Sequence, residues 1–314
     1  KDGSVTEFTE KGVDVGEEVK SAELTRTVIT GQNKGYGVYA VGGEMLEMTL
    51  DDVRISKVQT GVEVKRGKSL TMIGGTITGL GKGTGVDVTG SGEVTLEGGV
   101  KIRGFTTGVN VGGNLTMTGG SITGNGSGGY GVYAVGTVRL DGEVKISEVG
   151  MGVSAGDNLT MTGGSITGGR KGVGVYAVGT EKMTMVLDGV RISEVGMGVY
   201  VKNGKSLTIR GNSTISLADG GEYGVGVYVG EGVKRASLTK TVIKGGRKGV
   251  GVYAVGTENM TMTLEGVEIS EVGAGVYVKN GTLIMRGENS TISLADGGRY
   301  GGGCIWGMGW RVRV

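Results

Sequence analysis

The sequence predicts an all-β fold, a single-stranded parallel β-helix (solenoid) of about 12 coils with roughly 24 residues per coil. The first observation is a six-residue stretch, Gly-Val-Tyr-Ala-Val-Gly, which begins at Gly37, Gly131, Gly174 and Gly251. The second is a relaxed marker, Gly-Val-x-(Val or Ala), whose copies follow one another at nearly regular steps from Gly12 to Gly275. The third is a short apolar/polar alternation between markers, which is typical of half-buried strands.

Composition agrees with one elongated array of repeats. Gly accounts for 71 of 314 residues and Pro is absent, which excludes collagen, while the content of β-branched residues is too high for a disordered linker. The formal net charge is only +2, with 33 basic and 31 acidic residues, so no global field favours nucleic acid as a partner. Any electrostatic partner is expected to bind a local patch.

Residues 61–85 illustrate one coil. The first segment, 61–64, carries Val62 and Val64 on one face, and a turn rich in Lys, Arg and Gly follows it. The second segment is Leu-Thr-Met at 70–72, and after a Gly-Gly turn the third is Thr-Ile-Thr at 76–78. Alternation places the apolar residues of all three segments inside and the polar ones outside. Each coil is therefore expected to contain three short strands.

The same segments recur along the chain, so equivalent strands can stack. Copies of the second segment stand at 115–117, 159–161 and 207–209, and copies of the third at 121–123, 165–167 and 214–216. Stacking makes three parallel sheets around one narrow aliphatic core, and the rest of each coil supplies the crossover that parallel strands need. A helical interpretation fails because Gly recurs throughout and no 3.6-residue period is present. At roughly 4.8 Å per strand, the array is expected to be a rod about 60 Å long.

The expected β-helix covers residues 1–301, and 302–314 form an irregular tail. Residues 170–229 and 247–300 align with a constant offset of 77, which indicates that three coils were copied as a block. Where this offset predicts Gly-Val-Tyr-Val, the chain has Gly303-Cys304-Ile305-Trp306. Two interpretations stay open for the tail: a cap on the stack, or a non-native end produced by a shifted reading frame.

A column of tyrosines is the first candidate binding feature. The residue after Val in each marker faces outward by alternation, and in the last five regular coils it is Tyr176, Tyr200, Tyr228, Tyr253 and Tyr277. Adjacent rings would lie about 4.8 Å apart. The column is either a ladder that stabilises the stack itself or a rigid aromatic surface for a protein or sugar ligand.

Basic residues are expected in the turns on both sides of this column. Arg170, Lys171, Arg247 and Lys248 precede the tyrosines, and Lys202, Lys205 and Lys279 follow them. The charges either make the turns soluble or bind a sulfated glycan or an acidic receptor face.

The residue types give little support to catalysis. Histidine is absent and Cys304 is the single cysteine, so the commonest general base and metal ligand are missing and no intrachain disulfide can form. Carboxylates such as Asp51 and Asp52 do not recur as a convergent cluster. We therefore expect a protein that is not an enzyme, with no cofactor, no metal site and no catalytic residue. The alternatives are a polysaccharide-degrading β-helix enzyme (lyase or hydrolase) and a passive structural stalk.

The repeats resemble those of a known family. Gly-Val-Tyr-Ala-Val-Gly and the stretch Asn-Leu-Thr-Met-Thr-Gly-Gly-Ser-Ile-Thr-Gly at 114–124 and 158–168 are similar to passenger domains of bacterial type V autotransporters. The similarity is greatest to the passengers of vasculotropic pathogens, some of which act on endothelial cells as angiogenic factors. It covers the chain up to about residue 301.

This resemblance implies a right-handed coil and export through an outer-membrane translocator barrel that is not in this chain. The expected localisation is secreted or on the bacterial outer-membrane surface. The expected function is that of a virulence factor binding host endothelial cells, as a receptor-activating, proangiogenic ligand or as an adhesin. Its partner would be a host cell-surface receptor, such as an endothelial growth-factor receptor, or a sulfated glycan.

Overall fold

The computed structural model describes residues 2–126, 128–219, 224–287 and 289–295 in full, and the backbone of 304–306 and 312–313. Every regular element in this described part is a β-strand, and no helix occurs in it. The all-β prediction is confirmed. The described residues accordingly include no helix of the length and apolarity that a membrane span requires.

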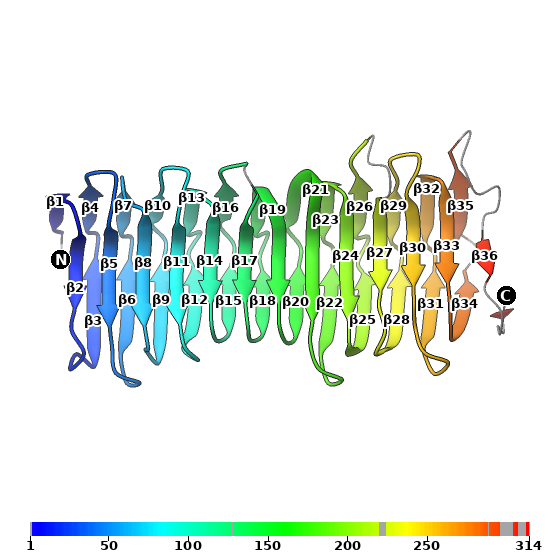
Figure 1. Cartoon of the computed structure of the whole chain (residues 1–314), viewed down its shortest axis with the longest axis horizontal. Helices are drawn as coiled ribbons and strands as arrows, with labels where there is room; N and C mark the ends of the chain where they lie inside the picture. Colours follow the sequence, from blue (N-terminus) through cyan, green and yellow to red (C-terminus); the bar gives the residue numbers. More distant parts are fainter. Residues whose placement is uncertain are drawn as a thin grey trace. The chain divides into compact units, whose positions relative to one another are not determined.

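Each coil contains three strands, as the alternation predicts. In the coil analysed above these are β8 (Thr60–Lys65), β9 (Ser69–Ile73) and β10 (Thr76–Thr78), after which β11 (Thr84–Thr89) begins the next coil. In Figure 1 the strands equivalent to β8 run downward in front and those equivalent to β9 return upward behind as the chain advances from left to right. This path is a right-handed coil.

The strands fall into three series, named here after their sequence: Gly-Val strands, Leu-Thr strands and Ile strands. The Gly-Val strands are β2 (Lys11–Val15), β5 (Tyr36–Val41), β8, β11, β14 (Thr107–Val111), β17 (Tyr130–Ala134), the end of β19 (Lys145–Ala155), the end of β21 (Ser165–Val178), β24 (Met197–Lys202), β27 (Val225–Val229), β30 (Val250–Ala254), β33 (Ala274–Val278) and β36 (Cys304–Trp306).

The Leu-Thr strands are β3 (Ser21–Thr25), β6 (Glu47–Asp51), β9, β12 (Glu93–Glu97), β15 (Leu115–Thr118), β18 (Val138–Asp141), β20 (Leu159–Thr162), β22 (Thr184–Asp188), β25 (Gly204–Arg210), β28 (Val233–Thr239), β31 (Thr261–Glu265), β34 (Thr282–Arg286) and β37 (Val312–Arg313). The Ile strands are β1 (Ser4–Phe8), β4 (Val28–Gly31), β7 (Arg54–Ser56), β10, β13 (Lys101–Phe105), β16 (Ser121–Gly124), the starts of β19 and β21, β23 (Arg191–Val195), β26 (Thr214–Leu217), β29 (Val242–Lys244), β32 (Glu268–Val272) and β35 (Thr291–Leu294).

The chain divides into two compact units, residues 1–154 and 155–314. Within each unit, strands of one series pair in parallel with the equivalent strands of the coils before and after. Val62 pairs with Val86 in unit 1, and Val227 pairs with Val252 in unit 2. Each unit is thus a β-solenoid in which one coil takes roughly 24 residues, as predicted.

In two coils no break separates the Ile strand from the Gly-Val strand. The markers at Gly131, Gly152 and Gly174 stand closer together in the sequence than any others, so the two coils between them are the shortest. In these two coils the chain stays extended from the Ile strand into the Gly-Val strand, which produces the long strands β19 and β21. Through these two long strands the Ile and Gly-Val series belong to one sheet, and the Leu-Thr strands form the other.

The core is aliphatic, and the marker glycine is part of it. Val252, Ile269 and Leu264 represent the three series, and each is at most 1% exposed. At Gly251 an added Cβ would stand 2.5 Å from Ile269 Cγ2 and 2.6 Å from the carbonyl oxygen of Gly275. Because real Cβ atoms do not approach other atoms this closely, the coil requires a residue without a side chain there. The same Ile-on-Gly contact recurs in both units and explains why the marker begins with glycine.

Two short strands follow the regular repeat within the expected tail. The backbone of β36 pairs with β33, so that Val276 is matched with Cys304, and the backbone of β37 pairs with β34. The other residues after 295, and all side chains of β36 and β37, lie outside the described residues.

Candidate binding face on the Gly-Val strands

The five predicted tyrosines form a continuous ladder on the outer face of unit 2. Ring centroids are 4.8 Å apart for Tyr176 and Tyr200, 4.7 Å for Tyr200 and Tyr228, 5.6 Å for Tyr228 and Tyr253, and 4.8 Å for Tyr253 and Tyr277. The planes of neighbouring rings differ by 2° to 16°. The sequence-based expectation of outward, stacked rings is confirmed.

Strand geometry places each ring. In β24 the side chains of Val199 and Val201 point into the core and are fully buried, so the intervening Tyr200 points outward. Parallel pairing then sets Tyr200 beside Tyr228 on β27 with no shift in register. All five tyrosines are half-buried, because each ring covers the faces of its neighbours and leaves its edges in solvent.

Packing changes the acidity of the central ring. The pKa of Tyr228 is raised, first because burial disfavours the phenolate and then because Tyr200, Tyr253 and Glu231 would repel its negative charge. Tyr228 therefore stays neutral at physiological pH and presents a hydroxyl group that can donate and accept hydrogen bonds.

An apolar column lies beside the tyrosines. Three residues before each Tyr, the pairing register aligns Val173, Met197, Val225, Val250 and Ala274 in successive coils. The first four of these side chains are half-buried. Their presence widens the aromatic strip into a flat apolar face, which the sequence analysis did not single out.

Two of the predicted lysines lie directly on the other side of the ladder. Lys202 pairs in register with Val178, two residues beyond the tyrosine position, and Lys279 occupies the equivalent place after Tyr277. A Cβ on Gly230 would stand 3.1 Å from a ring carbon of Tyr228 and 3.2 Å from Cβ of Lys202. The Lys202 stem therefore packs close to the ladder while its ammonium group reaches solvent.

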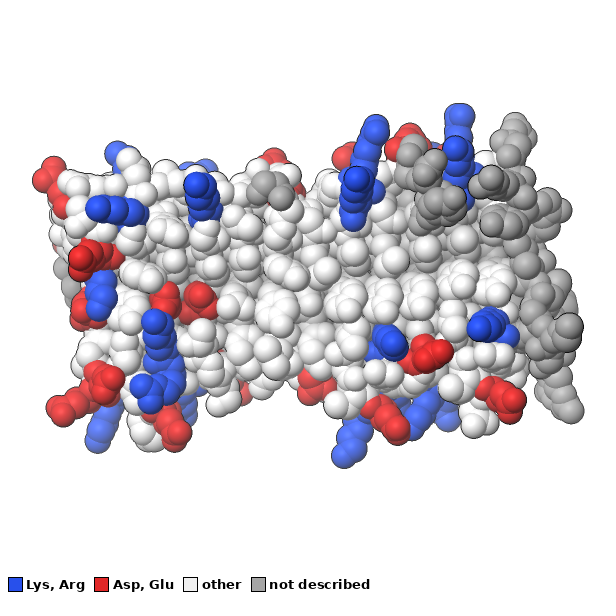
Figure 2. Space-filling view, viewed as in Figure 1, with Lys and Arg blue, Asp and Glu red and all other residues white. Residues whose placement is uncertain are grey.

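The other predicted cations border the face at greater distance. Arg170, Lys171, Arg247 and Lys248 precede their tyrosines in the chain, and all four are exposed. Figure 2 shows basic side chains on both sides of a pale central band in the right half of the view. The expectation that all seven cations lie in turns is wrong for four of them: Arg170 and Lys171 belong to the continuous strand β21, Lys202 ends β24 and Lys205 lies in β25. The backbone at these two residues of β21 stays extended from the Ile strand to the Gly-Val strand.

Lys205 takes part in a separate basic cavity. It lies in strand β25 and, with Lys182, Lys234, Arg235 and the single carboxylate Glu181, lines a hollow of about 480 Å³. Lys234 pairs with Glu181 at 3.2 Å. Lys182, Lys234 and Arg235 were not among the predicted site residues. The adjacent pair Lys234 and Arg235 could have indicated a basic patch from the sequence. Their position beside Lys182, however, results from the stacking of successive coils.

Unit 1 has no equivalent ladder among its described residues. Its outward column contains Tyr39, Glu63, Asp87, Asn110 and Tyr133 in register, and Asn110 donates a hydrogen bond of 2.8 Å to Asp87. Glu63 is only 8% exposed, since its neighbours in the column cover it. A stacked aromatic face is therefore a property of unit 2.

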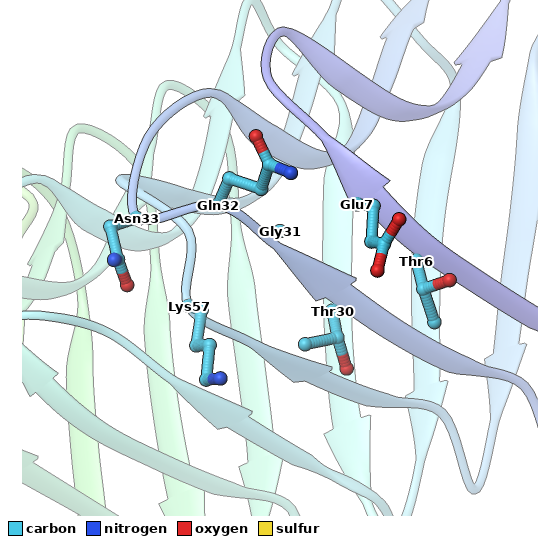
Figure 3. A pocket seen from close by; sticks show the side chains of 7 residues that line it. All are labelled: Thr6, Glu7, Thr30, Gly31, Gln32, Asn33 and Lys57. Atoms are coloured by element: carbon cyan, nitrogen blue, oxygen red, sulfur yellow. The ribbon is translucent and has the colours of Figure 1, made fainter.

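A polar cavity of about 400 Å³ lies at the amino-terminal end of unit 1 (Figure 3). Its lining includes the hydroxyls of Thr6 and Thr30, the Asn33 amide and the charged groups of Glu7 and Lys57. None of the predicted site residues belongs to it. No group of three or more His, Cys, Asp or Glu side chains suited to a metal ion occurs among the fully described residues.

These features define a class: a right-handed parallel β-solenoid repeat protein with an aromatic and apolar face on its second unit. The chain matches no protein family, no curated protein and no solved structure with which it was compared.

Proposed function

We propose that this protein is a secreted or surface-displayed bacterial virulence factor that binds host endothelial cells through the Gly-Val face of unit 2. The face is defined by the five stacked tyrosines with Lys202 and Lys279 beside them. Its partner is a host cell-surface receptor, and the protein acts as a receptor-activating ligand or as an adhesin.

The tyrosine ladder is the observation that carries this proposal. Stacking between Tyr176 and Tyr277 fixes the rings before any ligand arrives, so little side-chain entropy is lost on binding. Tyrosine is enriched among residues that dominate the energy of protein interfaces. An apolar, aromatic strip on a repeat protein is the kind of surface on which partners dock.

The charged borders favour an acidic partner. Lys202, Lys279 and the basic pairs at 170–171 and 247–248 lie on either side of an uncharged centre. A hydrophobic centre with a charged rim is the usual anatomy of a protein interface, and the rim speeds encounter with an oppositely charged surface. The same cations would also accept a sulfated glycan on the cell surface.

The type of target cell comes from the sequence resemblance to autotransporter passengers. That resemblance rests on the repeated stretches at 114–124 and 158–168, and it implies export, display and action on endothelium. The solenoid fold is compatible with this role and equally with other roles of β-solenoids.

The test is binding of the purified, labelled protein to cultured endothelial cells, with receptor tyrosine phosphorylation measured in the same wells. Saturable binding that unlabelled protein displaces, together with phosphorylation, would identify a receptor-activating ligand. Saturable binding without phosphorylation would identify an adhesin. If no displaceable binding occurred, the proposal would be wrong, and a polysaccharide-degrading enzyme or a structural stalk would be the functions to test next.

A further inference from the structure

A row of basic side chains with a period of two coils lies on the Ile strands of unit 1. Pairing in register places Arg54, Thr76, Lys101, Ser121 and Lys145 in one column on five successive strands. Cations alternate with hydroxyl residues along this column. All three cations are exposed, and Thr76 and Ser121 are half-buried between them.

The column has a defined spacing. Parallel strands lie about 4.8 Å apart, so cations on every second strand are about 9.6 Å apart along a straight line. That distance is close to the length of one disaccharide in an extended polysaccharide. In unit 2 the equivalent column keeps this alternation at Ser165, Arg191 and Thr214 and loses it at Val242 and Glu268.

The cations are not neutralised by the protein. Among the described residues, Arg54, Lys101 and Lys145 take part in no ion pair. A carboxylate at position 76 or 121 would form favourable cross-strand pairs worth roughly 0.2–1 kcal/mol each. Hydroxyls stand at these positions instead, so the fold retains three uncompensated positive charges in a row.

A second column of polar groups runs parallel to the first. Two residues further along each strand, about 6.6 Å away, the pairing aligns Ser56, Thr78, Arg103, Thr123 and Ser147. Arg103 donates a hydrogen bond of 3.0 Å to the Thr78 hydroxyl, and Ser147 donates one of 3.5 Å to Thr123. Together the two columns form a flat strip of hydroxyl and cationic donors with no large apolar or aromatic side chain.

The cavity in Figure 3 continues this strip toward the amino-terminal end. Thr6 pairs with Thr30 and Thr30 with Ser56, so two hydroxyls of the cavity belong to the second column. The Thr30 and Ser56 hydroxyl oxygens lie 3.4 Å apart. The amides of Gln32 and Asn33 add hydrogen-bonding groups of the kind that recognise sugar hydroxyls.

We propose that this strip, the two columns on the Ile strands of unit 1, binds a linear acidic polysaccharide. Its sulfate or carboxylate groups, one per disaccharide, pair with Arg54, Lys101 and Lys145, and its hydroxyls bond to the Ser and Thr side chains between them. The inference is independent of the proposed function, because it concerns other residues, another face and the other unit.

The composition of the strip distinguishes this ligand from other polyanions and from a protein. Single-stranded nucleic acids are bound through aromatic residues that stack on bases, and the two columns contain none. Protein interfaces draw their energy from buried aromatic and apolar anchors, which are also missing from the columns. A hydrophilic polymer with regularly spaced negative charges is complementary to the hydroxyl and cationic groups of the strip and to the spacing of its cations.

The first experiment measures affinity for size-defined heparin oligosaccharides and for oligogalacturonates by isothermal titration calorimetry with the whole chain. The test variant is Arg54→Gln/Lys101→Gln/Lys145→Gln, and the matched control is Lys20→Gln/Lys34→Gln/Lys240→Gln, which removes equal charge from exposed positions elsewhere. We expect the affinity of the test variant to fall by at least about tenfold. The slope of log affinity against log salt concentration should decrease by about three, one for each cation removed. The control should change affinity by less than about threefold.

A second variant tests the period at constant composition. Lys101→Ser/Ser121→Lys exchanges neighbours in the column, so net charge stays the same while the even spacing is lost. We expect it to bind the oligosaccharides as weakly as the triple variant, with unchanged circular dichroism and melting temperature.

The outcomes separate clearly. Loss of affinity in both test variants with an unaffected control supports the inference. At matched charge per oligosaccharide, stronger binding of heparin identifies sulfate groups as the anions, and stronger binding of oligogalacturonate identifies carboxylates. An equal loss in the control variant, wild-type affinity in the exchanged variant, or no binding of either polymer at physiological salt would overturn it.

Discussion

Tyr200 and Tyr228 stack with their centroids 4.7 Å apart and their planes inclined by only 2°. They belong to β24 and β27, and the chain between them passes through the complete coil. The two tyrosines are further apart in the sequence than any other neighbouring pair in the ladder. Parallel pairing of the two strands nevertheless keeps the rings face to face, because register is set by the core residues and not by loop length.

The first prediction concerns the ladder as a binding surface. Tyr200→Ala combined with Tyr253→Ala should weaken binding to endothelial cells by about tenfold or more, since loss of one aromatic anchor often costs about 2 kcal/mol at an interface. Circular dichroism should retain its β-type spectrum because both side chains lie outside the core. The matched control is Tyr39→Ala/Tyr133→Ala in unit 1, which should bind as the wild type does. Unchanged binding by the folded ladder variant would show that the face is not the binding site.

The second prediction concerns the marker glycine. Gly251→Ala should lower the melting temperature, because the new methyl group would collide with Ile269 and the Gly275 carbonyl, and overpacking of this kind costs about 1–3 kcal/mol. Gly169→Ala is the control, since no atom lies within 4 Å of the position its Cβ would take. Thermal unfolding followed by circular dichroism should show a decrease for the first variant alone; equal melting temperatures would contradict the packing argument.

The third prediction concerns the largest buried side chain of unit 1. Phe105 is 1% exposed and fills the space above Gly79, where an added Cβ would stand 2.6 Å from the ring. Phe105→Ala should leave a cavity and destabilise unit 1 by about 3–5 kcal/mol. Phe8, the other phenylalanine, is half-buried, so Phe8→Ala should cost clearly less. Urea unfolding of both variants measures the difference, and similar losses would refute the assignment.

The fourth prediction concerns alkaline pH. The pKa of Tyr228 is raised above its ordinary value of 10.0, mainly by burial. The folded state therefore holds the phenolic proton more tightly than the unfolded chain, and the resulting stabilisation is complete below pH 10.0 and is lost as pH rises through the higher folded-state pKa. In the Tyr228→Phe variant the melting temperature should fall less steeply above pH 10.0 than in the wild type. Absorbance of the phenolate band, followed against pH, should show one fewer tyrosine that ionises late. An unchanged titration curve would contradict the raised pKa.

Much of the fold was predictable because the repeat makes every local pattern recur. Alternation at Val62 and Val64 indicated which side of a strand is buried, and the recurring marker fixed the coil length. The outward tyrosine column followed from the same two facts. Its ring spacing could be predicted because the distance between parallel strands varies little.

Other features of the fold and of its surface depend on contacts between residues that lie far apart in the sequence and share no visible pattern. The packing of Ile269 onto Gly251 and the convergence of Lys182 with Arg235 are set by how the coil closes. The extension of β21 through Arg170 and Lys171 could not be predicted locally, because basic residues beside glycines are equally typical of a turn. The alternating cations from Arg54 to Lys145 became visible as one row only when the register of the Ile strands was known.

The sequence alone determined that this chain is a parallel β-solenoid, because strand alternation and a repeat of about 24 residues leave the apolar side chains no other common interior. The tertiary structure decided which side chains stand next to one another on the outer faces. Neighbours there are separated by a whole coil in sequence, and only the hydrogen-bonded register between coils brings Tyr200 to Tyr228 or Lys101 to Ser121. Local residue patterns define each strand, but surface chemistry arises from the pairing between strands.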